Sequence, residues 1–167
     1  SHLAMLQEQG SPNSRVKQLI LGGEDLTTEL ALHATRVFGP QVVIHNEYGP
    51  TEGTVGCIVH SFDPSRDSDT SVPIGQPIDN MQAYVLDDRG QAVPKGVVGR
   101  LFVGGAGLAA GYLNRATLTE EKFGERAGVP SVRLYDTGDL ARHGDHGGLD
   151  YLGRADHQVK IRGARIE

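Results

Sequence analysis

The chain has no tryptophan, a single cysteine and only two methionines among its 167 residues. With Cys57 alone no internal disulfide can form, which favours a reducing compartment and predicts a cytoplasmic protein. No segment approaches the ~20 apolar residues that a membrane helix needs, and the first residues lack the charged-then-apolar pattern of a secretory leader. The formal net charge of -5 provides no basic surface. We therefore expect neither membrane nor nucleic-acid partners.

Glycine, by contrast, is abundant, with 23 residues against a usual share of about 7%. Glycine permits turns and close backbone approaches, which predicts several loops suited to ligands. The hydrophobic share of 38% and the charged share of 22% are typical of a globular protein. Residues 1–5 resemble an expression scar, and we expect them to carry no information about the fold.

The residues from 6 to 62 have the pattern of the C-terminal part of an α/β subdomain. An apolar segment at 16–21, helical spacing over 27–38 and an apolar run at 42–44 predict a strand, a helix and a strand buried on both faces. A strand–helix–strand unit of this length predicts two parallel strands. Open α/β sheets bind ligands at the carboxyl ends of such strands, here after Gly22-Gly23 and from His45 onward.

After residue 62 the chain changes to short strands separated by turns, which predicts a β-rich subdomain over 63–153. Its expected elements include strands at 81–86 and 100–103 and a hairpin that joins Leu140 to Tyr151. The capping-box spacing of Thr117 to Glu120 predicts the start of a short helix that runs through Phe123. Residues 154–167 alternate apolar and basic positions and predict the start of a further element.

Four clusters have the residue types of a binding site, and each has a plainer alternative. Residues 46–52 offer an aromatic ring, a hydroxyl and a carboxylate after a strand, or else form an ordinary surface turn. Residues 104–111 match Gly-x-Gly-x-x-Ala, but no helix follows, so we favour a structural glycine loop over a dinucleotide site. Residues 135–140 place Asp139 where it could accept two ribose hydroxyls, or form a simple turn. Residues 153–163 suit an anion site or a hinge, or else an exposed basic strand.

Taken in this order and spacing, these clusters resemble the signature blocks of one family. NEYGPTE, GRLFVGGAGLAAGYLNR, YDTGDL and GRADHQVKIRGARIE are similar to blocks of the adenylation domains of nonribosomal peptide synthetases, within the wider adenylate-forming superfamily of acyl-CoA synthetases and luciferases. The resemblance extends from about Val16 to Glu167, and its last block is most similar to the amino-acid-activating branch. One residue departs from the pattern, because Arg100 stands where the family usually has an acid, and we interpret this as surface variation.

The resemblance implies a partial adenylate-forming fold of the α/β plus β class. It would comprise the end of a parallel α/β subdomain, a distorted β-barrel-like subdomain, and at 154–167 the hinge and the start of a small C-terminal domain. The implied reaction uses ATP and Mg²⁺ to form an aminoacyl-adenylate, which is loaded as a thioester onto the phosphopantetheine of a peptidyl carrier domain. A condensation domain of the same assembly line and a role in antibiotic biosynthesis are implied as well. The family's phosphate loop and its catalytic lysine are not in these 167 residues, so we expect the fragment alone to be inactive.

The resemblance also implies a role for individual residues. Thr51, Glu52 and Lys160 would be catalytic, with Thr51 at the α-phosphate, Glu52 on Mg²⁺ and Lys160 in the thioester-forming conformation. The implied nucleotide-binding residues are Gly23 and Tyr48 at the adenine, Thr51 at the phosphate, Asp139 at the ribose hydroxyls and Arg154 at the ribose-phosphate region. Asp156 would be the hinge residue.

The substrate side chain would contact Ile20, Gly22, Glu47, Val55 and Gly56. A carboxylate in a small apolar pocket requires a partner, so Glu47 calls for a carboxamide N–H or an ammonium on the substrate. This pattern resembles the pockets of asparagine-activating domains, with an ornithine-like cation as the second possibility. Two other functions stay open: a fatty- or aryl-acid ligase of the same superfamily, and a non-catalytic scaffold or docking module.

Overall fold

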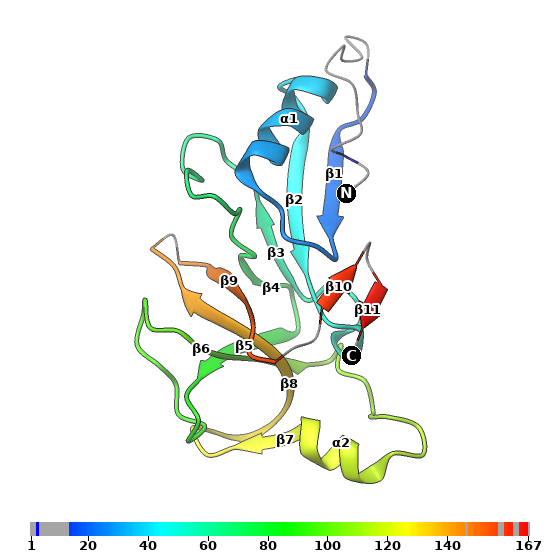
Figure 1. The fold of residues 1–167 in the computed structure, drawn as a ribbon, viewed down its shortest axis with the longest axis vertical. Helices are drawn as coiled ribbons and strands as arrows, with labels where there is room; N and C mark the ends of the chain where they lie inside the picture. Colours follow the sequence, from blue (N-terminus) through cyan, green and yellow to red (C-terminus); the bar gives the residue numbers. More distant parts are fainter. Residues whose placement is uncertain (1–2, 4–13, 146, 157–158, 162–163, 167) are drawn as a thin grey trace.

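The computed structural model describes Leu3 and residues 14–145, 147–156, 159–161 and 164–166. Within this part an α/β unit lies above a β-rich unit in the view of Figure 1. The elements of the α/β unit are β1 (Gln18–Gly22), α1 (Thr28–Phe38), β2 (Val43–Tyr48), the short 3-10 helix η2 (Thr51–Gly53), β3 (Ile58–Ser61) and β4 (Gln76–Pro77). Those that follow are β5 (Met81–Leu86), β6 (Gly99–Gly105), α2 (Ala116–Lys122), β7 (Phe123–Arg126), β8 (Val129–His143), β9 (Leu149–Arg154), β10 (Val159–Ile161) and β11 (Ala164–Ile166).

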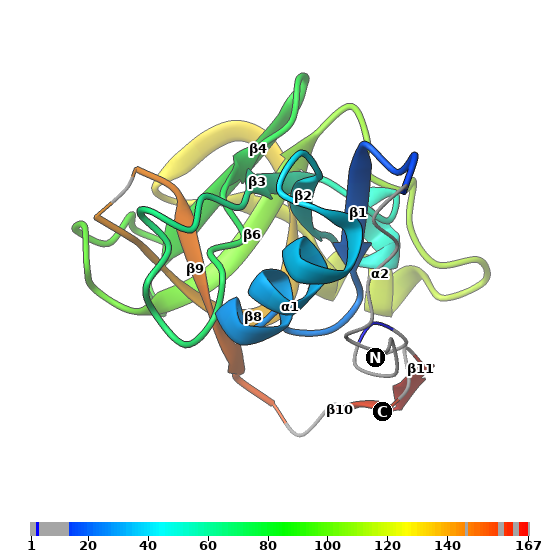
Figure 2. The same ribbon diagram turned by 90° about the horizontal axis from the view of Figure 1, so that it is seen from above.

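The first sheet has the strand order β1-β2-β3-β4, and β1 and β2 are parallel, which confirms the predicted strand–helix–strand unit. Helix α1 lies against one face of these two strands, as Figures 1 and 2 show. The Thr27 side chain begins the helix by accepting a hydrogen bond from the backbone N–H of Leu30, and Gly39, with φ of 97°, follows its last residue. The buried side chains between helix and sheet include Ala31, Ala34 and Ile44.

The prediction that the second strand is buried on both faces is wrong. Side chains of β2 alternate between buried and partly exposed, and Val43 is 41% exposed whereas Ile44 is 2% exposed. Alternation follows from the period of two in a strand, because only the face toward α1 is covered in the described part of the chain. The strand also extends to Tyr48, so the first half of the NEYGPTE block belongs to the strand itself.

The β-rich unit is a five-stranded sheet with the order β5-β6-β8-β7, and β9 pairs with β8. Its core includes Val85, Leu101, Val103 and Tyr135, all at most 2% exposed. Among the described residues the sheet is strongly curved but stays open rather than closing into a barrel, and the long strand β8 bends around it (Figure 1). The predicted hairpin between residues 140 and 151 is confirmed by the pairing of Ala141 with Tyr151.

Strand β8 contains a bulge that determines where Asp139 points. Arg100 of β6 pairs with Leu140, but Phe102 pairs with Asp136. Residues 137–139 of β8 therefore lie opposite a single residue of β6, Leu101. The Thr137 hydroxyl donates to the Leu101 carbonyl at 2.7 Å and fixes the bulge in place. Bulges redirect side chains next to functional sites, and this one releases Asp139 from the regular alternation of the strand.

Two further expectations need correction. The capping box over residues 117–120 does not form, because α2 begins after Arg115 and the Thr119 hydroxyl donates to the Arg115 carbonyl one turn back. Phe123 is not helical but is the first residue of β7. Arg100 is more than surface variation, since its guanidinium contacts the Asp136 carboxylate at 2.6 Å.

Candidate functional site

A cavity of about 340 Å³ opens where the carboxyl ends of β1 and β2 meet the bulge of β8 and strand β9. Seven of its lining residues come from the predicted site or lie beside it: Gly23, Asn46, Glu47, Tyr48, Asp139, Tyr151 and Arg154. The cavity thus joins residues from three of the four clusters that the sequence singles out. It lies at the place where open α/β sheets bind ligands.

Tyr48, Asp139 and Arg154 form a hydrogen-bonded chain along one wall of this cavity. The Tyr48 hydroxyl donates to Oδ2 of Asp139, and Nη1 of Arg154 donates to Oδ1 of the same carboxylate at 2.9 Å. Asp139 is only 6% exposed, so these two donors satisfy a buried negative charge. The backbone N–H of Asp139 donates to the Thr137 hydroxyl at 3.0 Å and fixes the turn beneath it.

The Arg154 guanidinium connects this wall with the residue predicted to be the hinge. Its Nε and Nη2 atoms donate to both carboxylate oxygens of Asp156, at 2.9 and 2.6 Å. The Nη1 atom also donates to the Thr137 carbonyl at 2.7 Å. A single planar guanidinium therefore contacts Asp139, Asp156 and the backbone of β8.

The electrostatics of the wall keep its phenols neutral. Burial, followed by the charge of Asp139, raises the pKa of Tyr48 well above its ordinary value of 10. Burial, together with the charge of Asp139, raises the pKa of Tyr151 to about 12. Burial alone would lower the pKa of Arg154, but its hydrogen bonds to Asp156 and the charge of Asp139 raise it above the usual value.

The predicted substrate residues lie on and beside the face of the sheet opposite α1. Glu47 pairs with Gly22 across the two parallel strands, and a Cβ atom on Gly22 would lie 2.7 Å from the Glu47 carbonyl oxygen. A Cβ atom on Gly56 would lie 2.2 Å from Oε1 of Glu47, so the carboxylate packs directly on the Gly56 backbone. Ile20 and Val55 lie at the outer part of this face and are 65% and 70% exposed.

The second half of the NEYGPTE block forms a tight turn in which Thr51 and Glu52 have different environments. Thr51 is exposed, whereas Glu52 is 6% exposed. The Tyr112 hydroxyl donates to Oε1 of Glu52 at 2.5 Å, and Tyr112 in turn lies 3.3 Å from the Tyr135 hydroxyl. Neither Thr51 nor Glu52 lines the cavity beside Tyr48.

Lys160, the remaining predicted catalytic residue, lies in the β10–β11 hairpin, where its backbone pairs with that of Arg165. Its side chain is outside the described residues, as are His157 and Gln158 of the same block. The described part of the chain therefore brings five of the predicted site residues to one cavity: Gly23, Glu47, Tyr48, Asp139 and Arg154. Asp156 contacts Arg154 beside it, Thr51 and Glu52 lie outside the cavity, and the Lys160 side chain is not described.

Sequence reasoning missed three residues of the site. Tyr112 holds Glu52, Tyr151 lines the cavity with its ring 6.1 Å from that of Tyr48, and Thr137 supports Asp139. Thr137 lay inside a block that the sequence singled out, so its neighbour Asp139 already indicated it. Tyr112 lies in the GRLFVGGAGLAAGYLNR block and Tyr151 at the end of the predicted hairpin, but neither position indicates a contact with Glu52 or Tyr48, which are far away in sequence.

Metal binding can be assessed from the donor atoms. Within the described ranges no three His, Cys, Asp or Glu side chains are placed to hold a metal ion together. Mg²⁺ is typically held by one or two carboxylates together with substrate phosphates, and Glu52 is the carboxylate that the sequence predicts for this role.

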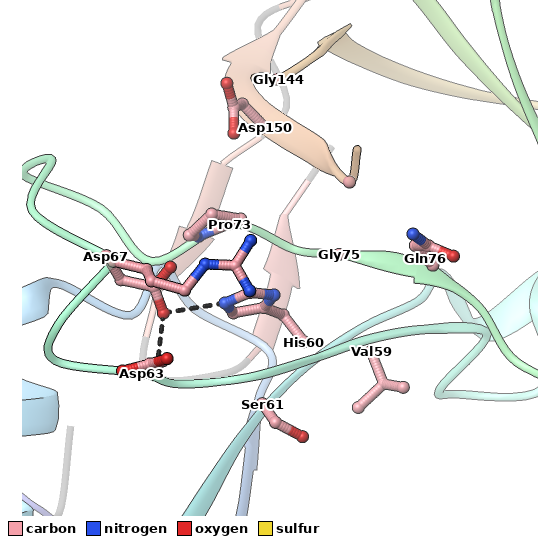
Figure 3. Close-up of a pocket in the computed structure, with 12 residues that line it drawn as sticks. Val59, His60, Ser61, Asp63, Asp67, Pro73, Gly75, Gln76, Gly144 and Asp150 are labelled. Carbon is pink, nitrogen blue, oxygen red and sulfur yellow. Dashed lines mark hydrogen bonds and ion pairs between the residues drawn. The ribbon is translucent and has the colours of Figure 1, made fainter. Parts of the chain in front are cut away.

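A second cavity, of about 350 Å³, lies between the loop that follows β3 and the β8–β9 turn (Figure 3). The Asp67 carboxylate accepts hydrogen bonds from His60 Nε2 and from the backbone N–H of Asp63, each at 2.8 Å. Asp150, on the opposite wall in Figure 3, pairs with Arg142 at 3.0 Å. The Asp67 and Asp150 carboxylates therefore already have partners within the chain, and the sequence pointed to neither of them.

The geometry can be compared with that of known proteins. Residues 1–113 match the model of the family described as AMP-binding enzyme. The chain belongs to this family. The match covers the whole α/β unit and the first two strands of the β-rich unit, so family membership extends across both units.

Relatives of this AMP-binding chain include large peptide synthetases. It is 50% identical over 167 residues to bacitracin synthase 3 of Bacillus licheniformis and 46% identical over 167 residues to tyrocidine synthase 3 of Brevibacillus parabrevis. Both alignments cover 100% of this chain, but the chain spans only 3% of each of these relatives. The similarity confirms the resemblance to nonribosomal peptide synthetases.

Solved structures confirm the fold. PA1221, a nonribosomal peptide synthetase protein with adenylation and PCP domains, superposes with a TM-score of 0.83 at 34% identity, over 90% of this chain and 30% of that one. The Vibrio cholerae adenylation domain AlmE, in complex with glycyl-adenosine-5'-phosphate, gives 0.82 at 31% identity, over 98% and 31%. The predicted partial adenylate-forming fold is therefore correct. No described helix is long and apolar enough to cross a membrane.

Proposed function

We propose that this chain is part of an adenylation domain that activates an amino acid with ATP and Mg²⁺ and loads it as a thioester onto a phosphopantetheine carrier domain. The observation that carries the proposal is the cavity wall of Tyr48, Asp139 and Arg154, which combines an aromatic ring, a buried carboxylate and a cation. Relatives that are peptide synthetases, and a neighbour solved with an aminoacyl-adenylate, support the same reaction class.

In this proposal the cavity binds the nucleoside part of ATP. Tyr48 and the backbone at Gly23 contact the adenine, Asp139 accepts the two ribose hydroxyls, and Arg154 reaches the ribose-phosphate region. The two ribose hydroxyls would donate to Asp139 in place of the Tyr48 hydroxyl and the Arg154 guanidinium. Tyr48 and Arg154 would then turn toward the ligand, which lies beside them in the same cavity. The buried Asp139 carboxylate would thus accept hydrogen bonds both with and without the ligand.

The reaction joins two anions, because the substrate carboxylate attacks the α-phosphorus of ATP. Mg²⁺, when bound, neutralises phosphate charge, and the residues proposed to hold it at the protein are Glu52 and its supporting turn. Thr51, exposed at the first position of η2, donates a hydroxyl hydrogen bond to the α-phosphate. Lys160 acts in the thioester-forming conformation, which is reached by rotation at Asp156.

The amino acid proposed as substrate is asparagine. The Glu47 carboxylate is partly buried, lines the cavity and packs on the backbone of Gly56, and the adjacent strand carries no side chain at Gly22. Such a carboxylate favours a substrate that donates hydrogen bonds, and a carboxamide does so without adding a second ion to the pocket. An ornithine-like ammonium would pair with Glu47 by charge and is the second candidate.

The division of the chain follows the same proposal. Residues 6–62 belong to the α/β subdomain, residues 63–153 to the β-rich subdomain, and residues 154–167 to the hinge and the beginning of the small domain. The Arg154–Asp156 contact at this last boundary supports a hinge there, since a guanidinium with several partners can exchange one for another as the domains rotate. The carrier domain and a condensation domain are the proposed protein partners.

ATP–pyrophosphate exchange on the intact adenylation domain that contains this chain tests the function. Separate reactions would contain Asn, Asp, Gln, ornithine or an aryl acid. We expect exchange with Asn, and we expect Glu47→Gln to lower kcat/KM for Asn about tenfold or more, because one hydrogen bond to a charged group contributes about 1.5–3 kcal/mol. The matched control is Glu29→Gln, which changes an exposed carboxylate on α1 outside this cavity.

Each outcome distinguishes the candidates. Exchange with ornithine alone would keep the enzyme and overturn the assignment of asparagine. Exchange with only the aryl acid would favour the acyl- or aryl-ligase alternative. Absence of exchange with every acid would leave the scaffold or docking module as the better function, and activity of the 167-residue fragment by itself would contradict the expectation that it is inactive.

A further inference from the structure

Glu52 is held at both its backbone and its side chain by one loop of the β-rich unit. The backbone N–H of Ala109 donates to the Glu52 carbonyl at 2.8 Å, and the Tyr112 hydroxyl donates to Oε1 at 2.5 Å. The Thr54 hydroxyl, in the same turn as Glu52, donates to the Gly107 carbonyl. We call residues 105–112 the supporting loop. It contains most of the glycine cluster that the sequence assigned to structure alone.

The supporting loop is itself fixed from the side away from Glu52. The Arg133 guanidinium donates to the carbonyls of Ala109 and Ala110 at 2.9 and 2.8 Å and lies 4.4 Å from the centre of the Phe123 ring. The edge of the Tyr112 ring packs on Phe123, with 5.7 Å between the ring centres. The position of the Tyr112 hydroxyl therefore follows from contacts that do not involve Glu52.

A second phenol limits how Tyr112 can orient its hydroxyl. Tyr135 is 2% exposed, and its oxygen lies 3.3 Å from that of Tyr112. The two hydroxyls and the carboxylate form a short polar row inside an otherwise apolar core.

We propose that Tyr112 is a positioning residue for Glu52: its hydroxyl, held by the supporting loop, fixes the orientation in which the Glu52 carboxylate meets the metal–nucleotide complex. This inference rests on the proposed role of Glu52 as the Mg²⁺ ligand. A hydrogen bond of this length to a carboxylate belongs to the strong, charge-assisted class. Outer hydrogen bonds to a ligating carboxylate typically change metal affinity or activity by about 10–100-fold.

The arrangement also explains why the loop is rich in small residues. A Cβ atom on Gly107 would lie 2.8 Å from the Met81 sulfur, and a Cβ atom on Gly105, where φ is 112°, would lie 2.2 Å from the Asn80 carbonyl oxygen. A bulkier loop could not approach the Glu52 turn closely enough for the Ala109 and Tyr112 contacts. The supporting loop thus serves the site without touching the nucleotide cavity.

The test uses the intact adenylation domain and four variants: Tyr112→Phe, Tyr135→Phe, Tyr84→Phe and Glu52→Gln. The readout is the binding of Mn²⁺, measured by electron paramagnetic resonance and by calorimetry, at saturating α,β-methylene-ATP. We expect Tyr112→Phe to weaken Mn²⁺ binding by about tenfold or more, with a smaller change for Tyr135→Phe. Tyr84→Phe removes an exposed phenol whose oxygen lies 3.4 Å from Gln82, and we expect no change.

A split between KM and kcat provides the second readout. In pyrophosphate exchange, Tyr112→Phe is expected to raise the half-saturating Mg²⁺ concentration more than it changes the rate at saturating Mg²⁺. Unchanged Mn²⁺ binding in Tyr112→Phe, with a clear loss in Glu52→Gln, overturns the positioning role and leaves the proposed role of Glu52 intact. Unchanged binding in Glu52→Gln overturns both. A Tyr112→Phe variant that only melts earlier, with normal metal affinity, would show a structural role and also overturns the inference.

Discussion

Replacing Tyr48 by Phe removes one oxygen atom from the core of the proposed site and leaves the ring in place. The lost hydroxyl donates to Asp139, which is 6% exposed and also pairs with the Arg154 guanidinium. Hydrogen bonds to charged groups contribute about 1.5–3 kcal/mol, and Arg154 still partly compensates the carboxylate. We therefore expect Tyr48→Phe to lower the free energy of unfolding by about 2 kcal/mol at pH 7.

The pH dependence of the unfolding free energy tests whether the Tyr48 phenol is buried and protonated in the folded protein. Because the pKa of Tyr48 is raised above 10 in the folded protein, the unfolded state releases its proton first as the pH increases. The contribution of Tyr48 to stability is thus complete below pH 10 and decreases above it by about 1.4 kcal/mol per pH unit. The variant has no such phenol, so the difference between the two proteins should shrink by about 1.4 kcal/mol between pH 9 and 11.

Urea unfolding of the intact domain, followed by fluorescence or circular dichroism at several pH values from 7 to 11, measures both quantities. Tyr84→Phe provides the matched control, because its hydroxyl is outside the site and lies 3.4 Å from the Gln82 side-chain oxygen. A Tyr48→Phe difference below about 0.5 kcal/mol at pH 7 would refute the hydrogen bond as a source of stability, and one that does not change with pH would refute the buried, protonated phenol.

Three further outcomes follow from the described contacts. Asp67→Ala should lower the unfolding free energy by about 1–3 kcal/mol in urea melts, because it leaves the Asp63 N–H and His60 without their acceptor; an unchanged melt would contradict this. Gly56→Ala should reduce amino-acid-dependent exchange by about tenfold or more, since its Cβ would meet Glu47 at 2.2 Å, and wild-type kinetics would contradict it. Cys57 is fully buried, and burial raises its pKa to about 12, so Ellman's reagent should label it only after unfolding; rapid labelling of the native domain would contradict this.

The sequence predicted the parallel pair of strands because its signal is local. Periodicity across residues 27–38, stopped by Gly39, defines one helix between two apolar runs, and chain connectivity then leaves few alternatives to a parallel pair. The same local reasoning failed at α2. Thr117 and Glu120 have the spacing of a capping box, but the side chain of Thr119 forms its bonds with Arg115 and Tyr112 instead.

The site was predictable where one short block contains both the functional residue and its support. Thr137 and Asp139 lie two positions apart, and the bulge between them has the Thr-Gly signal of a turn. Glu52 and Tyr112 are 60 residues apart, and nothing in the spacing of either indicates the other. Such pairs depend on how two sheets pack, and that information is absent from propensity and periodicity.

The hydrogen bond from Tyr48 to Asp139 joins residues 91 positions apart, across both units of the chain. Contacts of such long sequence separation form late in folding, because closing the intervening loop costs conformational entropy before the contact energy is gained. A newly made chain whose two sheets have each formed, but have not yet packed together, has no complete cavity at this edge. Under the proposed function, a nucleotide would bind only after the two sheets have packed together, and its binding would stabilise the packed state against their separation.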